Sequence, residues 1–561
     1  MAFQFVRKKK NPFDQTTPAP RRGKFSQVMI GLVVTAVVGF LAYYVLLPVF
    51  NLHAAESYFF VGFLCLVFMA CSLFTSGIRI QDGEPRTYFK RLRAQAVIPL
   101  GIIAVMVVVF VIGSVISWPI FRAGAYRSLI DVKTGDFAAE VHEVSYNQIP
   151  LLDKDSAERL GDRKLGELSD MVSQFEVSND YTQINYGGRP VRVTPLVYGD
   201  TVKWFYNRKA GLPAYIKIDM VTQAVEVVRL PEGMKYSPSE LFGRNLIRHL
   251  RFSYPTMMFD APTFEIDDNG HPYWICPRLV KTIGLFGGTD IRGAVIMDAV
   301  TGESSYYEEI PTWVDRVYTA ELIMEQYDYY GTLKNGFLNS LFGQKDVTVT
   351  TAGYNYIAMN DDVYVYTGIT SVTGDESNIG FILSNQRTKE TTFYPAAGAE
   401  EYSARSSAEG VVQHLGYRST FPLLLNIAGE PTYFMSLKDN AQLVKMYAMV
   451  NVKQYQIVAT GTTVAECERQ YRELLRQNNV VVTEPGQERQ VTGRIAEIRE
   501  AVREGTSYYY FRLESGGVYY VISAADSELA VILSTGEKVT IEYDDVAEGE
   551  IVRAFSVVRA R

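Results

Sequence analysis

Three long apolar segments near the start of the chain constrain its fold more than any other feature. They are Val28–Phe50, Tyr58–Gly77 and Ala96–Ile120, and none contains Asp, Glu, Lys or Arg. A helix of about twenty residues crosses a bilayer core of roughly 30 Å with its backbone groups hydrogen-bonded internally. The sequence therefore predicts three transmembrane helices followed by a large soluble region.

The charges beside these segments predict which way the chain crosses the membrane. The tail before the first segment is basic, and so is the loop between the second and third; their basic residues are Arg7, Lys8, Lys9, Lys10, Arg21, Arg22, Lys24, Arg79, Arg86, Lys90, Arg91 and Arg93. The loop Asn51–Ser57 has no Lys or Arg. The positive-inside rule places the tail in the cytoplasm and the soluble region outside the cell membrane.

Composition limits the classes of partner. The chain has 62 acidic and 55 basic residues and a net charge of −7, which disfavours a nucleic-acid partner. It has 4 Cys, of which only Cys276 and Cys467 lie outside the apolar segments. A disulfide framework is excluded, while a single bond between these two remains open. Sparing use of cysteine fits a Gram-positive bacterium.

A hairpin pattern recurs four times in the soluble region. Apolar and polar residues alternate around a polar turn at Tyr215–Val228, Ala294–Tyr307, Gly380–Tyr394 and Tyr447–Val458. Three of the four turns read Asp/Asn-x-x-Thr, in which the Asx side chain closes the turn on the backbone.

Helices are expected between and after these hairpins. Ser237–Glu240 has the form of a capping box with Pro238 at the first helical position. Further helices are predicted at Trp313–Tyr327, from about Ala404, and at Val464–Leu475. The shared order of hairpins, helices and Gly-x-Pro-aromatic turns indicates an internal duplication into two α+β units.

Two resemblances accompany these patterns. The hairpins with Asp-x-x-Thr-Gly turns resemble the PepSY domain, a module of bacterial envelope and secreted proteins associated with peptidase control. The whole layout resembles a Firmicute group of three-span membrane proteins, some of them labelled CvpA-like (colicin-V production) or Tat-signal proteins. The stretches that carry this second resemblance are Gly161–Gly166, Ser173–Val177, Tyr329–Phe337 and Tyr356–Tyr364. It implies placement in the cell envelope and supplies no activity.

The last segment is predicted to be a separate barrel. After a linker at Glu484–Glu488, strands are expected at Val491–Val502, Tyr508–Leu513, Val518–Ser523, Lys538–Tyr543 and Ile551–Val558, with a short helix at Asp526–Leu533. This order is that of an OB-fold. Nine basic and 13 acidic residues from Glu488 onward leave no basic groove for nucleic acid, so a protein, a glycan, a small ligand or simple packing on its neighbours remain open.

The predicted fold is thus an N-terminal α-helical membrane region with three transmembrane helices, an α+β ectodomain with antiparallel sheets, and a C-terminal OB-like β-barrel. The predicted segments are a basic cytoplasmic tail (1–25), three transmembrane helices (26–120), a membrane-proximal α+β segment (121–208), a first PepSY-like α+β unit (209–330), a second α+β unit with a preceding β segment (331–480) and the barrel (488–561).

The sequence singles out no catalytic, cofactor-binding or metal-binding residue. His249 and His414 occupy matching places in the two repeats, where capping a helix end is favoured over ligand binding. Gly284–Gly288 is expected to be a loop rather than a phosphate site, because no Lys-Ser/Thr follows it. The pairs Asp267-Asp268, Asp361-Asp362 and Asp544-Asp545 are assigned to turns rather than to calcium.

The aromatic segments have similar alternatives. Tyr327–Tyr330, Tyr508–Phe511 and Tyr519-Tyr520 could line a groove for a glycan or peptide, and core packing is favoured. Phe337–Phe342 could touch the membrane surface or a partner, and helix packing is favoured there too.

These patterns lead to one hypothesis and two alternatives. The chain is interpreted as a non-enzymatic, membrane-anchored envelope protein whose ectodomain is a binding or scaffolding module for a protein partner. The first alternative is an envelope peptidase or peptidoglycan hydrolase, or a regulator of one. The second, a transport or secretion accessory, has little support because the three apolar segments contain no charged residue. The oligomeric state is left open.

Overall fold

The computed structural model describes residues 24–75, 85–141, 143, 149–359, 361–371, 377–478, 480, 489–503, 506–524, 527–543 and 551–560. Most of the basic tail, Arg79, the predicted linker at 484–488 and the pair Asp544-Asp545 lie outside these residues. The chain divides into two compact units. Unit 1 comprises Met1–Ser117, Ile247–Met258 and Gly284–Gly287; unit 2 comprises Trp118–Leu246, Phe259–Ile283 and Gly288–Arg561.

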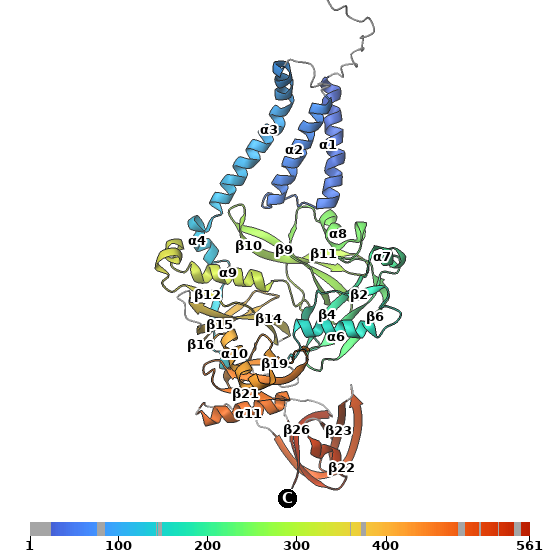
Figure 1. The fold of residues 1–561 in the computed structure, drawn as a ribbon, viewed down its shortest axis with the longest axis vertical. Coiled ribbons are helices and arrows are strands. Elements are labelled where there is room, and N and C mark those ends of the chain that lie inside the picture. Colours follow the sequence, from blue (N-terminus) through green and yellow to red (C-terminus); the bar gives the residue numbers. More distant parts are fainter. Residues whose placement is uncertain are drawn as a thin grey trace, which may run out of the picture. The chain divides into compact units, whose positions relative to one another are not determined.

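Unit 1 contains the three predicted apolar helices, drawn in blue in Figure 1. They are α1 (Lys24–Leu46), α2 (Ala55–Thr75) and α3 (Pro85–Ile116), and all three are long and apolar enough to cross a membrane. The third ends before the predicted Ile120, because Pro119 begins a separate helix, α4 (Pro119–Arg127).

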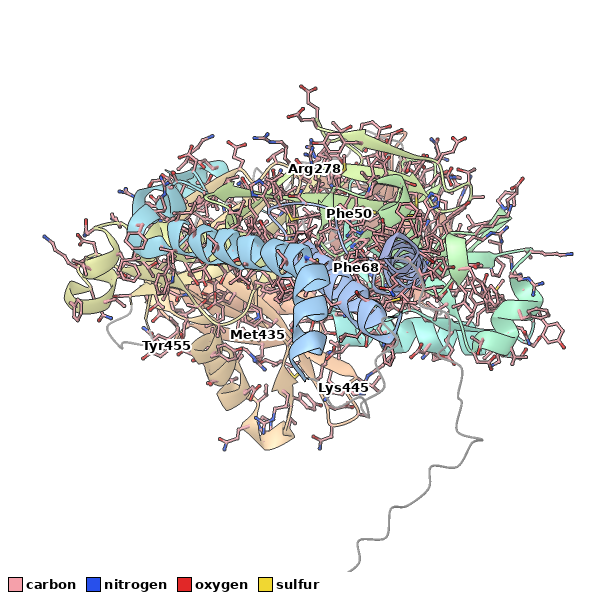
Figure 2. All side chains as sticks on the ribbon, turned by 90° about the horizontal axis from the view of Figure 1, so that it is seen from above. Phe50, Phe68, Arg278, Met435, Lys445 and Tyr455 are labelled. Carbon is pink, nitrogen blue, oxygen red and sulfur yellow. The ribbon has the colours of Figure 1, made fainter. Side chains whose placement is uncertain are left out.

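Small residues allow α1 and α2 to pack closely. A Cβ at Gly31 of α1 would lie 3.0 Å from the ring of Phe68 on α2, which Figure 2 labels. A Cβ at Gly39 would lie 2.8 Å from Leu64 on the same helix. Glycine at these two positions therefore lets large apolar side chains of α2 reach the backbone of α1.

Unit 2 contains four antiparallel sheets that share one strand order. In each, the first strand pairs with the third, the second also pairs with the third, and the fourth and fifth follow in sequence. The first sheet has β2 (Phe175–Val177), β3 (Thr182–Tyr186), β4 (Arg189–Tyr198), β5 (Leu212–Asp219) and β6 (Val225–Met234). The second has β7 (Met258–Phe259), β8 (Thr263–Ile266), β9 (Pro272–Ile283), β10 (Gly287–Asp298) and β11 (Ser304–Tyr307).

The third and fourth sheets repeat this order. The third has β12 (Thr348–Thr350), β13 (Asn355–Met359), β14 (Asp362–Ser371), β15 (Ser377–Asn385) and β16 (Thr391–Ala399). The fourth has β17 (Arg418–Ser419), β18 (Leu423–Ile427), β19 (Glu430–Lys438), β20 (Val444–Asn451) and β21 (Val458–Gly461). The repeated structure is one helix followed by one sheet, and it occurs four times with one predicted hairpin in each copy.

The four predicted hairpins are confirmed, and each is the last strand pair of its sheet. Asp219, Asp298 and Asn385 each accept hydrogen bonds from the backbone N–H groups two and three residues later. Asn451 accepts one from the N–H of Gln454. The Asx side chain therefore closes every turn, as the spacing predicts.

The helices outside the membrane segments are mostly short. They are α5 (Phe137–Glu140), α6 (Lys154–Gly166), α7 (Thr201–Asn207), α8 (Leu246–Ser253), α9 (Ala320–Thr332), α10 (Glu401–Val411), α11 (Val464–Gln477) and α12 (Glu528–Ile532), with short turns at η2 (Phe242–Arg244), η3 (Asn339–Gly343) and η4 (Gln413–Leu415). The helix predicted from Val464 is confirmed.

Two predicted helices begin later than expected. The capping box at Ser237–Glu240 is wrong: the Glu240 carboxylate is buried and accepts hydrogen bonds from Tyr198 and Trp204, so α8 starts only at Leu246. The helix predicted from Trp313 starts at Ala320, because the preceding backbone N–H groups bond elsewhere and Thr319 supplies the cap.

A short strand from the start of unit 2 completes the third sheet. β1 (Val132–Thr134) pairs in parallel with β16, with Val132 opposite Thr391. This covers the edge that β16 would otherwise expose.

The C-terminal region is a closed barrel, shown in red in Figure 1. Its strands are β22 (Arg489–Arg503), β23 (Thr506–Leu513), β24 (Tyr519–Ser523), β25 (Lys538–Tyr543) and β26 (Ile551–Arg559), in the order β22-β23-β24-β26-β25. β24 and β26 are parallel. The long β22 closes the barrel by pairing with β25 along its first part and with β23 along its second.

Candidate functional site

Two clusters of polar side chains stand out, one in each compact unit. The first, which we call the span-end joint, lies in unit 1 and consists of His53, Ser117, Arg248, Arg251 and the hairpin tip Gly284–Gly287. Ser117 follows directly after α3. Its Oγ accepts hydrogen bonds from the backbone N–H groups of Leu285 (2.9 Å) and Phe286 (3.0 Å). On the other side of the tip, His53 Nδ1 donates to the carbonyl oxygen of Leu285 at 2.8 Å.

The apolar side chains of the same tip pack between α2 and α3. The Phe286 ring lies 5.0 Å from Phe110 of α3 and 5.6 Å from Tyr58 of α2. A Cβ at Gly113 would lie 2.6 Å from a methyl carbon of Leu285, so only glycine leaves room for the tip. Phe110 precedes Ser117 by seven residues, about 10 Å along a helix. The Phe286 side chain therefore extends along the last turns of α3, while the N–H groups of Leu285 and Phe286 and the Leu285 carbonyl are hydrogen-bonded at its end.

Two arginines of α8 complete the joint at the end of α1. Arg251 Nε donates to the carbonyl oxygen of Leu47 at 3.0 Å and its Nη1 to that of Met257 at 2.7 Å. Arg248 Nε donates to the carbonyl oxygen of Tyr44 at 3.2 Å. The last carbonyls of a helix have no partner within it and carry partial negative charge, so cationic side chains stabilise this end. Burial lowers the pKa of Arg251, and the nearby Glu56 opposes that effect.

The second cluster, which we call the polar junction, lies in unit 2 and consists of Gln183, Asn185, Arg192, Glu265, Asp315 and Arg316. Its carboxylates are fully buried. Glu265 on β8 accepts hydrogen bonds from the backbone N–H groups of Asp315 (2.9 Å) and Arg316 (3.0 Å). Asp315 in turn accepts one from the N–H of Asn185 at 2.7 Å.

The two carboxylates disfavour each other's ionisation. Burial is the largest cause that raises the pKa of both groups, and for Asp315 the neighbouring Glu265 raises it further. Two backbone N–H groups stabilise ionised Glu265, whereas one oxygen of Asp315 has no hydrogen-bond partner among the described residues. Asp315 is therefore the member of the pair that holds a proton most readily.

Several other buried polar atoms in the junction also lack partners in the described part of the chain. They are Gln183 Nε2 and Oε1, Asn185 Oδ1, Arg192 Nε and Arg316 Nε. Arg192 lies directly opposite Gln183 in the β3–β4 ladder, and burial lowers its pKa to about 10. Buried polar atoms without partners are rare in native proteins and cost free energy, so their concentration here marks the junction as a strained polar core.

A small cavity lies beside the junction. Its volume is about 30 Å³, and its lining includes Asp153, Asn355 and Tyr356. Lys438 Nζ donates to both oxygens of Asp153; burial opposes ionisation of Asp153, but these bonds and those from Ser156 outweigh it and lower its pKa. A cavity of this volume has room for about one or two water molecules.

The histidines and acidic pairs predicted from the sequence are spread over the chain rather than gathered. His249 lies within α8 of unit 1 rather than at a helix end, and His414 lies in η4 of unit 2. Asp267 closes a turn, as predicted, by accepting from the N–H groups of Asn269 and His271. Asp362 differs from its prediction: it is buried in β14 and forms a bidentate ion pair with Arg387.

Some of the remaining predicted features agree with the structure and others do not. Phe511, Tyr520 and Tyr327 are buried, which agrees with core packing of the aromatic segments. The loop expected at Gly284–Gly288 is confirmed for residues 284–286, which join β9 to β10, whereas Gly287 and Gly288 are the first residues of β10. The packing expected for Phe337–Phe342 is confirmed for Phe337, which packs against a buried cluster that includes Tyr126. It is wrong for Leu338, Leu341 and Phe342, which are exposed. Cys276 and Cys467 are both buried and free.

Apart from the glycine-rich segment Gly284–Gly288, the sequence did not single out the residues that form the two clusters. No known functional motif includes Ser117, His53 or Leu285, so the sequence gives no reason to select them. The one local signal was the basic pair Arg248 and Arg251 on the same helix that carries apolar Leu246 and Leu250. Contacts between residues 168 positions apart, such as Ser117 and Leu285, leave no trace in a single sequence.

Comparisons with known proteins add no family. No family model matches the chain, and no curated protein matches it. Among solved structures, a crystal structure of an ACO/RPE65 chimera aligns at 7% identity with a TM-score of 0.14, covering 69% of this chain and 62% of that one. The chain thus spans less than two thirds of that neighbour, and a similarity this low carries no argument about fold or function.

Proposed function

We propose that this chain is a membrane-anchored scaffold of the bacterial cell envelope, whose soluble region holds a protein partner outside the cytoplasm. Three apolar helices of sufficient length support the anchor. The net charge of −7 supports a protein rather than a nucleic acid as partner.

The observation that carries this proposal is the span-end joint. A simple tether leaves the ends of its membrane helices free, whereas here two later segments, Ile247–Met258 and Gly284–Gly287, belong to the same compact unit as the helices. Arg251, Arg248 and Ser117 hold these segments by hydrogen bonds to backbone groups. An anchor built in this way holds these two segments at the ends of the membrane helices, and a scaffold requires such fixed attachment points.

Three finer assignments belong to the same proposal. The excess of basic residues before the first apolar helix and between the second and third supports a cytoplasmic N-terminus and an extracellular soluble region. The repeated Asx-closed hairpins support PepSY-like units. The three apolar helices support the resemblance to the three-span Firmicute group. The barrel order β22-β23-β24-β26-β25, with one parallel pair, supports an OB-like fold.

Protease shaving of intact cells tests the topology. The full chain carries one epitope tag at each end, and we expect the C-terminal tag to be lost while the N-terminal tag is retained. Retention of both tags, in cells where another exposed protein is cleaved, would contradict an extracellular soluble region.

Crosslinking in intact cells tests the scaffold role. We expect the tagged full-length chain to retrieve one protein in constant ratio, and Arg251→Ala to lower that yield at an unchanged amount in the membrane. Arg229→Ala, an exposed arginine paired with Asp170 on the surface, is the matched control. Cleavage of peptides or peptidoglycan by the purified protein would contradict a non-enzymatic scaffold.

A further inference from the structure

Unit 2 displays two groups of exposed apolar side chains that its own core does not cover. The first patch consists of Trp118, Ile120 and Phe121 on α4 together with Leu338, Leu341 and Phe342 around η3. The second patch consists of Val202, Phe205 and Tyr206 on α7 together with Phe242 of η2. Phe342 is 82% exposed and Tyr206 is 78% exposed.

Lipid-facing residues of the apolar helices show the same degree of exposure. Val105 of α3 is 63% exposed and Phe40 of α1 is 61% exposed. In a membrane, the lipid of the bilayer covers such side chains. Isolated exposed apolar residues are ordinary on a protein surface, whereas contiguous groups mark a contact surface.

The first patch is held rigidly by well-packed neighbours. Near the end of α4, the Tyr126 ring lies 4.7 Å from Tyr329 of α9, and Arg127 donates to the carbonyl oxygen of Lys334. Asn335 and Asn339 both donate to the carbonyl oxygen of Lys345, which closes the loop around η3. The apolar residues are therefore presented outward by a fixed loop.

The chain itself keeps the first patch close to the bilayer. Trp118 directly follows Ser117, the residue at the end of the third apolar helix, and consecutive Cα atoms are about 3.8 Å apart. An aromatic residue at this point of a membrane protein lies at the level of the lipid headgroups.

The second patch is tied in a similar way. Phe242 precedes Ile247 by five residues, at most about 18 Å of chain, and α8 then binds the last carbonyls of α1 through Arg248 and Arg251. The Trp204 ring lies 5.9 Å from Phe242, and Arg244 donates to the carbonyl oxygen of Arg208, so α7 and η2 form one surface.

Basic residues stand near both patches in the sequence. Arg127, Lys334 and Lys345 stand near the first, with the acidic Asp346; Lys203, Arg208, Lys209 and Arg244 stand near the second, with the acidic Asp200. Aromatic and aliphatic side chains combined with an excess of Lys and Arg are the composition of segments that lie in a membrane interface with anionic headgroups.

We propose that both patches rest on the bilayer surface, in contact with anionic lipid headgroups, on the side of the membrane where α3 ends. This inference rests on the proposed anchoring of α1, α2 and α3 in that bilayer.

Depth measurements on spin-labelled protein test this proposal. The full-length chain, with Cys65 and Cys71 replaced by Ala, is placed in nanodiscs of phosphatidylcholine and phosphatidylglycerol. Nitroxides are attached in turn at Phe342→Cys, Tyr206→Cys, Val105→Cys and Tyr455→Cys. Tyr455, labelled in Figure 2, is an exposed aromatic residue of the fourth sheet's last hairpin and is the matched control.

We expect the labels at positions 342 and 206 to collide several-fold more often with oxygen, relative to a water-soluble nickel complex, than the label at 455 does. The proposal is overturned if either label gives the same ratio as position 455; a patch that stays in water in nanodiscs then binds protein instead. The label at position 105 tests the anchoring of α3 separately from the contact of the patches, because a water-like ratio there would overturn the anchoring itself.

Discussion

The span-end joint and the polar junction bury polar groups in opposite ways. At the joint, Ser117, Arg248 and Arg251 meet backbone groups at distances between 2.7 and 3.2 Å. At the junction, Gln183 and Asp315 retain polar atoms without partners among the described residues. The joint therefore fixes the geometry of its segments, whereas the junction holds carboxyl groups whose charge depends on protonation.

Removing a side chain from the joint has the largest expected effect. Arg251→Ala deletes two charge-assisted hydrogen bonds to carbonyls, each worth about 1.5–3 kcal/mol. We expect hydrogen exchange of the Phe50 N–H, which bonds to the Pro255 carbonyl, to lose about 3 kcal/mol of protection. Arg229→Ala leaves this protection unchanged, and equal protection in both variants would show that Arg251 does not hold the joint.

A second substitution tests the fit of the hairpin tip. Gly113→Ala places a Cβ 2.6 Å from Leu285, and we expect overpacking to destabilise unit 1 by about 1–3 kcal/mol. The thermal unfolding midpoint of the full chain in mild detergent measures this. Gly101→Ala on the same helix is the matched control, because a Cβ there meets nothing within 4 Å. If the two variants unfold alike, the tip does not pack against α3.

The stability of the junction is expected to depend on pH. The raised pKa of Asp315 means that its protonated form is favoured on folding, so stability is highest in acid and falls as the pH rises from the ordinary value of 3.8 towards the raised one. Asp315→Asn removes this dependence, which amounts to about 1.4 kcal/mol for each unit of pKa shift.

The measurement is the thermal unfolding midpoint of the full chain at about pH 5 and about pH 8. We expect the difference between the two midpoints to shrink in Asp315→Asn. Asp268→Asn, in an exposed turn, is the control and keeps the wild-type difference. An unchanged difference in Asp315→Asn would mean that this carboxyl is ionised throughout.

The smallest expected effect has the opposite sign to the first. Gln183→Met replaces a buried amide, neither of whose polar atoms has a described partner, by an apolar side chain of similar length. We expect a gain of about 1 kcal/mol, because the cost of burying the amide disappears. A lower unfolding midpoint would show that Gln183 is satisfied and that the junction is not strained.

The sequence predicts those parts of the fold whose signals are local. Apolar segments of sufficient length specify α1, α2 and α3, and alternation around an Asx turn specifies each of the four final hairpins. The barrel strands were also found, because each carries its own alternating pattern.

The clusters could not be predicted, because distant residues form them. The N–H of Asn185 bonds to Asp315, 130 positions later, and three sequence-separated segments supply Asn185, Glu265 and Asp315. The false helix start at Ser237 has the same origin. Its local capping signal was correct in form, but Glu240 gains more from the buried hydroxyl of Tyr198 and indole N–H of Trp204 than from capping.

The parallel pairing of β1 with β16 has a consequence for biogenesis. The partner of Val132 is made about 260 residues later, which takes roughly 10–50 s at ordinary rates of synthesis. The segment that leaves the third membrane helix must therefore wait, unpaired, until the third sheet has been translated. During that interval the growing chain exposes an unpaired strand at β1, which a chaperone that recognises extended backbone would bind.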